Sequence, residues 1–122
     1  MKLTVHADGF EGHVKRSLVR AKRLDRKEKI EPEITLTFAD PLDMLDILTA
    51  KRLMLMKVAR QGKYSVSSLA AVLNRDPKSV RRDVVKLEQA GMLRTYEEVN
   101  PGHGRVRIVE PVARKVELRA SL

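Results

Sequence analysis

Two amphipathic helices separated by a turn of three residues constrain the fold of this chain more than any other feature. The first is predicted over 66–73 and the second over 77–90, each with apolar residues at helical spacing along one side. The turn between them is Asn74-Arg75-Asp76, in which Asn tolerates the left-handed conformation that ends a helix and Asp precedes a first-turn proline. We expect so short a connection to make the two helices cross instead of running antiparallel.

The segments on either side complete a familiar order of elements. A helix is predicted over about 50–61, and two strands follow at about 92–99 and 105–109. This order is that of a winged helix-turn-helix. In that fold the third helix, here 77–90, lies in the major groove of duplex DNA, and the hairpin or wing, here 93–109, contacts the backbone or the minor groove.

On the helix over 77–90 the basic side chains lie opposite the apolar ones. Successive steps of about 100° per residue place Val80, Val84 and Leu87 on one side. Asp83 falls near that side, where we expect it to pair with a neighbouring base. The opposite side offers hydrogen-bond donors to phosphates and guanine edges, and the residues predicted to contact DNA there are Lys78, Ser79, Arg81, Arg82, Lys86 and Gln89. The alternative is a solvated basic face without a ligand.

The predicted hairpin also separates basic side chains from apolar ones. Val106 and Ile108 point to one side of the strand, and Arg105 and Arg107 point to the other. The turn before them contains His103 among residues that favour turns. We predict that His103, Arg105 and Arg107 contact the DNA backbone or minor groove, the alternative being a strand that faces only solvent.

The stretch from Leu48 to Pro111 resembles the MarR-like winged-helix group of predicted prokaryotic transcriptional regulators. The resemblance is carried by LTAKRLMLMKVARQG, SVSSLAAVLNRDPKSVRRDVVKLEQAGML and GRVRI. It implies that the DNA-reading end of the third helix contains Lys78, Ser79, Arg81 and Arg82. The group often has Asn and His where this chain has Ser79 and Arg81. Asn74 occupies the position after the second helix where members of the group usually have glycine.

The whole chain resembles a branch of that group in which a strand-helix-strand arm precedes the winged helix. Some members of the branch are thought to be antitoxins, so a protein-interaction module that binds a toxin-like partner is the alternative function. We therefore predict an α+β fold with three parts: a βαβ arm over 1–40, the winged helix-turn-helix over 41–112, and a C-terminal strand over 113–122 that packs on the arm.

The predicted arm has its own pattern. Residues 2–7, 33–38 and 115–120 alternate polar and apolar as half-buried strands do. Between the first two, a helix over about 9–29 would begin with a capping box of Asp8 and Glu11. We expect the flanking strands to occupy its apolar stripe, which consists of Phe10, Val14, Leu18, Ala21 and Leu24. The open edges of so small a sheet would pair with a second copy, giving a two-fold homodimer.

The charge of the chain favours a polyanionic partner. Its 122 residues include 25 basic and 16 acidic side chains, a net charge of +9. Nucleic acid is the first candidate and an anionic membrane surface the second. The scarcity of aromatic residues disfavours stacking on single strands, so duplex DNA is preferred to RNA. The nine basic residues within 1–30 are either a second phosphate-binding surface or a solvated helix face.

Other classes of function are disfavoured. The chain has no cysteine, no H-E-x-x-H, no Walker A loop and no G-x-G-x-x-G. His6, His13 and His103 are far apart in sequence, so we expect no catalytic residue, no metal and no cofactor. No apolar stretch reaches the roughly 18 residues of a membrane span and no signal-peptide pattern is present, so we expect a cytoplasmic protein without a membrane partner.

Overall fold

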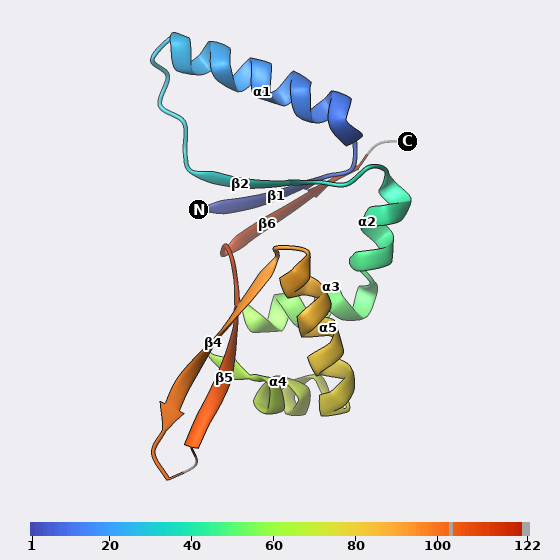
Figure 1. Ribbon diagram of the computed structural model, residues 1–122, viewed down its shortest axis with the longest axis vertical. Helices are drawn as coiled ribbons and strands as arrows, with labels where there is room; N and C mark the ends of the chain where they lie inside the picture. Colours follow the sequence, from blue (N-terminus) through green and yellow to red (C-terminus); the bar gives the residue numbers. More distant parts are fainter. Residues whose placement is uncertain (103, 121–122) are drawn as a thin grey trace. The chain divides into compact units, whose positions relative to one another are not determined.

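The computed structural model describes residues 1–102 and 104–120, and the chain divides into two compact units. The first unit combines residues 1–46 with the chain from Ala113 onward, and the second is Ile47–Val112 (Figure 1). The boundary predicted from the sequence precedes residue 41, whereas the division in the structure follows Asp46. Within the described ranges, no helix has the length and apolar character that crossing a membrane requires.

The first unit contains a parallel sheet in the order β2-β1-β6. The sheet brings together segments from both ends of the described chain, because β1 pairs with β2 on one side and with β6 on the other (Figure 1). The predicted βαβ arm and C-terminal strand are confirmed. The bounds are β1 Lys2–His6, α1 Gly9–Asp25, β2 Glu33–Thr37, α2 Pro41–Ile47 and β6 Lys115–Arg119.

This sheet has one polar and one apolar face. Residues level with one another in a parallel register share a face, and Thr4 is level with Thr35 and Glu117. The polar face therefore consists of Lys2, Thr4, His6, Glu33, Thr35, Thr37, Lys115, Glu117 and Arg119. The opposite face consists of Leu3, Val5, Ile34, Leu36, Val116 and Leu118.

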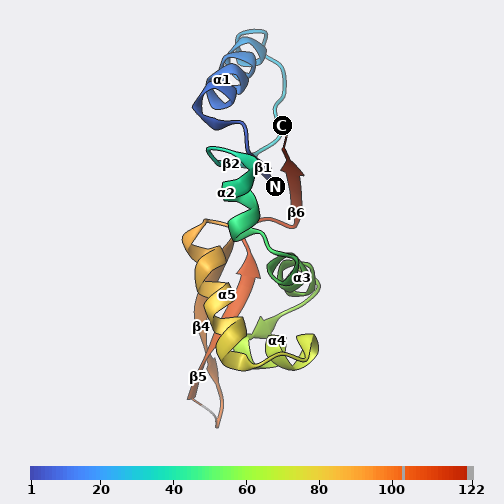
Figure 2. The same cartoon turned by 90° about the vertical axis from the view of Figure 1, so that its right-hand side faces the viewer.

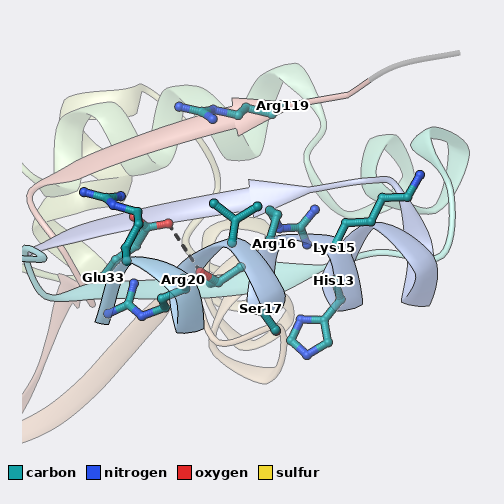
Figure 3. A pocket seen from close by; sticks show the side chains of 10 residues that line it. His13, Lys15, Arg16, Ser17, Arg20, Glu33 and Arg119 are labelled. Atoms are coloured by element: carbon teal, nitrogen blue, oxygen red, sulfur yellow. Dashed lines mark hydrogen bonds between the residues drawn. The ribbon is translucent and has the colours of Figure 1, made fainter. Parts of the chain in front are cut away.

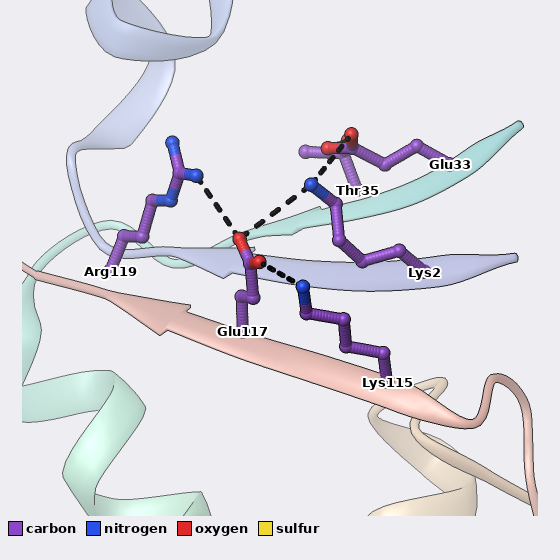
Figure 4. A network of polar contacts seen from close by, with 6 residues as sticks. All are labelled: Lys2, Glu33, Thr35, Lys115, Glu117 and Arg119. Atoms are coloured by element: carbon purple, nitrogen blue, oxygen red, sulfur yellow. Dashed lines mark hydrogen bonds and ion pairs between the residues drawn. The ribbon is translucent and has the colours of Figure 1, made fainter. Parts of the chain in front are cut away.

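An ion-pair network on the polar face links the three strands, with Glu117 at its centre (Figure 4). The Glu117 carboxylate lies 3.2 Å from the Lys115 ammonium and 3.0 Å from the Arg119 guanidinium. Lys2 lies 3.6 Å from Glu117 and 3.7 Å from Glu33. The hydrogen bonds from Lys115 and then Arg119 lower the pKa of Glu117, because they stabilise its charged form.

Helix α1 lies over the polar face and turns its apolar stripe away from the sheet. Phe10 is 81% exposed, Leu18 59% and Leu24 57%. The prediction that the strands occupy this stripe is therefore wrong. The predicted capping box is also wrong, because the Asp8 side chain makes no cap hydrogen bond and pairs with Arg16 instead. Arg16 also donates to the hydroxyl of Thr37 at 3.0 Å, which holds the basic side of α1 against the sheet.

The second unit is a winged helix-turn-helix, as predicted. It has three helices and an antiparallel sheet in the order β3-β5-β4. The short strand β3 lies between α3 and α4 in the chain, and the long β4–β5 hairpin that follows α5 is the wing (Figures 1 and 2). The two-residue strand β3 was not predicted, because it is too short to show an alternating pattern. The bounds are α3 Ala50–Ala59, β3 Tyr64–Ser65, α4 Val66–Leu73, α5 Pro77–Gln89, β4 Leu93–Asn100 and β5 Gly104–Pro111.

Local sequence signals account for the helix ends in this unit. Ser65 caps α4 and forms a reciprocal capping box with Ser68. Asn74 ends α4 in the left-handed conformation, with φ 53° and ψ 49°, as its side chain permits. Thr49 caps α3 by accepting a hydrogen bond from the N–H of Arg52. The helix end predicted at Asn74 is confirmed.

Apolar side chains from every helix of the second unit meet the sheet in one core. The fully buried side chains include Leu55, Leu69, Val80, Leu87, Met92 and Val109. Full burial of such a side chain is worth about 1.5–3 kcal/mol. In α2, Leu42 and Leu45 are exposed and Met44 is buried, as is Leu48 just after the helix.

Asp83 joins three elements of the second unit. One carboxylate oxygen lies 3.0 Å from Nε of Arg52 on α3, and the other lies 2.7 Å from Nη2 of Arg75 in the turn before α5. The Asp83 side chain is only 13% exposed, so water screens these contacts weakly. The predicted pairing of Asp83 with a neighbouring base is confirmed, and it fixes α5 relative to both α3 and the turn.

We predict that Asp83→Ala lowers the free energy of unfolding of the second unit by about 3 kcal/mol, because it leaves two mostly buried guanidinium groups without their carboxylate. Urea denaturation followed by tyrosine fluorescence measures this unit alone, since both tyrosines, Tyr64 and Tyr96, lie within it and the chain has no tryptophan. Asp76→Ala is the control, because Asp76 makes no side-chain cap hydrogen bond. Equal urea midpoints for Asp83→Ala and Asp76→Ala would contradict a stabilising role for the Asp83 ion pairs.

We also predict that the first unit loses stability in mild acid through His6. Burial, and secondarily the positive charge of Arg16, lower the pKa of His6 below its usual 6.5. The unfolded chain therefore takes up a proton near pH 6.5 that the folded protein accepts only at lower pH, and stability falls as the pH drops through that interval. Thermal unfolding at pH 7.5 and 5.5 should show a smaller pH effect for His6→Gln than for the wild type or for exposed His13→Gln.

Candidate nucleic-acid interface

The α5 residues predicted to contact DNA line one surface groove. The groove has a volume of about 950 Å³ and lies entirely within the second unit. All six of the predicted residues line it: Lys78, Ser79, Arg81, Arg82, Lys86 and Gln89. Ser79 is half-buried and the other five are exposed. The structure therefore brings these side chains together on one accessible surface.

The two acidic residues of α5 are both engaged in other contacts. Asp83 pairs with Arg52 and Arg75, as described above. Glu88 accepts a hydrogen bond of 2.6 Å from the hydroxyl of Thr95 on β4. As a result, the cationic groups of this face are not neutralised by the acids of their own helix. Within residues 1–102 and 104–120, no ion pair involves Lys78, Arg81, Arg82 or Lys86.

Two further basic residues of the groove were not predicted as site residues. Arg52 and Arg75 line it together with Asp83. Their guanidinium groups hold the Asp83 carboxylate, so they position α5 and the groove along it. The sequence signal that pointed toward them was the placement of Asp83 near the apolar side of its helix, which required a basic partner from another element.

The wing presents its arginines on a separate element. Arg105 and Arg107 are exposed on β5, whereas Ile108 is buried and Val106 is half-buried, as the alternation predicted. The wing residues line no part of the α5 groove as the structure describes it. His103, the third residue predicted to contact DNA from the wing, lies outside the described residues.

The carboxylates of β4 are occupied by basic side chains. Glu97 lies 3.2 Å from Arg105. Glu98 pairs with Lys63, and this hydrogen bond raises the pKa of Lys63. Arg107 faces Glu97 in the strand register but forms no ion pair with it. Among the described wing residues, Arg107 therefore has the less compensated charge of the two arginines.

Solved structures share the fold of the second unit. A possible transcriptional regulator from Methanosarcina mazei Go1 is 24% identical over 58% of this chain, with a TM-score of 0.50. NolR from Sinorhizobium fredii is 14% identical over 59% of this chain and 68% of its own, also with a TM-score of 0.50. The match spans 63% of the Methanosarcina chain, less than two thirds of its length. At these identities the likeness concerns the fold.

The comparison of sequences points to one family. No curated protein matches the chain. The family model HVO_A0114 matches residues 47–114, which are more than half of the chain and include the whole winged-helix unit. The chain therefore belongs to the HVO_A0114 family.

Proposed function

We propose that this protein is a transcriptional regulator that binds specific sequences of duplex DNA through α5 and the wing. The observation that carries the proposal is the groove along α5, where four cationic groups have no ion-pair partner among the described residues and both carboxylates of the helix are engaged elsewhere. Such a face matches the negative charge of the DNA backbone and the acceptor atoms of guanine. The class of the Methanosarcina protein, a possible transcriptional regulator, agrees with this proposal.

The side chains on α5 suit different parts of a duplex. Arg81 and Arg82 have planar guanidinium groups that can donate two parallel hydrogen bonds to O6 and N7 of a guanine. Lys78 and Lys86 are flexible point charges suited to phosphates. Ser79 and Gln89 add neutral donors and acceptors for base edges or the backbone. In this proposal Arg105, Arg107 and His103 bind the backbone or the minor groove beside the reading helix.

The proposed regulator acts as a two-fold homodimer, and we place its interface on α1. The exposed stripe from Phe10 to Leu24 spans about 20 Å of helix at 1.5 Å per residue. In an antiparallel pair of α1 helices, Glu11 of one copy lies near Lys22 and Arg23 of the other, and the helix dipoles oppose each other. This interface replaces the sheet edges expected from the sequence, because it buries large apolar side chains.

We predict that Arg82→Ala weakens specific binding by about 1–3 kcal/mol, or roughly 5–150-fold. The target is first obtained by selecting bound sequences from a random duplex pool, and affinity is then measured by fluorescence anisotropy at fixed salt. Lys57→Ala is the matched control, because Lys57 is an exposed basic residue of α3 outside the groove. A selection without any enriched sequence would overturn the proposal and favour the protein-interaction module, including a toxin-like partner.

We predict that the protein sediments at about twice its mass of 13.9 kDa, and that Leu18→Glu converts it to a monomer, because the charge would be buried in the interface. Analytical ultracentrifugation at micromolar concentration measures this. Val72→Glu is the control, since Val72 is 57% exposed on α4, nearly the same as Leu18. A dimer that persists in Leu18→Glu would exclude α1 as the interface.

A further inference from the structure

A cleft lies between α1 and the polar face of the parallel sheet in the first unit (Figure 3). The start of α1 is held close to β2, because the N–H of Gly9 donates to the carbonyl of Phe38 at 3.1 Å. A side chain at Gly9 would bring its Cβ to 3.2 Å from the carbonyl oxygen of Ala39. Farther along the helix, residues 13–23 and the sheet enclose a space of about 620 Å³. This volume is within the range of about 300–1,000 Å³ typical of small-molecule sites.

The wall of the cleft is strongly basic. Its cationic side chains are Lys15, Arg16, Arg20 and Arg23 from α1 and Arg119 from β6 (Figure 3). The carboxylate that lines it, Glu33, also lies near the Lys2 ammonium and accepts a hydrogen bond from the hydroxyl of Thr35. Arg119, Arg23 and Lys15 pair with acids that do not line the cleft, namely half-buried Glu117 and exposed Glu28 and Glu11. The acids of the first unit therefore compensate the charge of this cleft only in part.

Several donors at the cleft lack a partner. Arg16 uses Nη1 and Nη2 for Asp8 and Thr37, but its Nε is buried without a hydrogen bond within the described part of the chain. The hydroxyl of Thr4, on the central strand of the same polar face, is also buried and unpartnered there. Arg20 forms no ion pair with any described residue. Buried donors without partners are uncommon in folded proteins, because each costs free energy.

We propose that this cleft binds a small molecule through a phosphate group, with Arg16 and Arg20 as the principal contacts and Arg119 on the opposite wall. Guanidinium groups donate paired hydrogen bonds to phosphate oxygens, which suits a wall made mainly of arginines. The volume of this open cleft, which lies between a helix and a sheet of one unit, suits a compact phosphate-bearing molecule. The proposal rests on residues of the first unit alone and is independent of DNA binding by the second.

The test uses the full chain and pyrophosphate as the probe. Isothermal titration calorimetry at constant ionic strength measures its affinity for the wild type, Arg20→Gln and Lys22→Gln. Both variants remove one positive charge from α1, but Lys22 is exposed and lines no part of the cleft. Because Arg20 has no ion pair in the described fold, its replacement leaves the packing of α1 intact. We expect saturable binding that falls at least tenfold in Arg20→Gln and less than twofold in Lys22→Gln.

A second measurement locates the probe. The Nε–H resonance of Arg20 in a ¹H–¹⁵N spectrum should shift on saturation with pyrophosphate, because this exposed side chain lines the cleft and gains an acceptor. Equal loss of affinity in both variants, or an unshifted Arg20 signal in the wild type, would show general charge attraction and overturn the site. A larger effect of Arg20→Gln on duplex DNA than on pyrophosphate would assign the cleft to the DNA backbone and also overturn it.

Discussion

The groove along α5 depends on one carboxylate, that of Asp83. It holds Arg52 of α3 on one oxygen and Arg75 of the preceding turn on the other. These two contacts hold the Asp83 carboxylate away from the exposed face of α5 and attach the helix to α3 and to the preceding turn. The same interaction fixes α5 in place and leaves its exposed face positive, the two properties that the proposed recognition helix needs. Apolar packing of Val80, Val84 and Leu87 beneath it completes the attachment.

The helix-turn-helix was predictable because its signals are local. Asn74, Pro77 and the apolar spacing each determine the conformation of their own few residues, and they agree with one another. The six α5 residues of the groove were predictable for the same reason, since a helical wheel places side chains without knowledge of the neighbours. Arg52 could not be assigned in this way, because its role arises only from a contact with Asp83 across 31 positions of sequence.

The orientation of α1 shows the limit of such patterns. Its apolar stripe was visible in the sequence, but a stripe does not reveal which surface it faces. The sheet beneath α1 presents polar residues, and Arg16 anchors the helix to Asp8 and Thr37. The basic side therefore faces inward, and the stripe that periodicity assigns to a core lies on the outside. One side of α1 therefore lines a charged cleft, and another side presents an exposed apolar surface.

The strand order β2-β1-β6 also has a consequence for biosynthesis. β1 leaves the ribosome before the winged-helix unit does, but one of its two neighbours, β6, begins only at Lys115, after that unit. The winged-helix unit, encoded between them, has all its strands and helices available before that sheet can close. We therefore expect the unit at the middle of the chain to fold during translation, while β1 waits with an unpaired edge. A pause or truncation before β6 would then yield a folded winged-helix unit attached to an incomplete sheet.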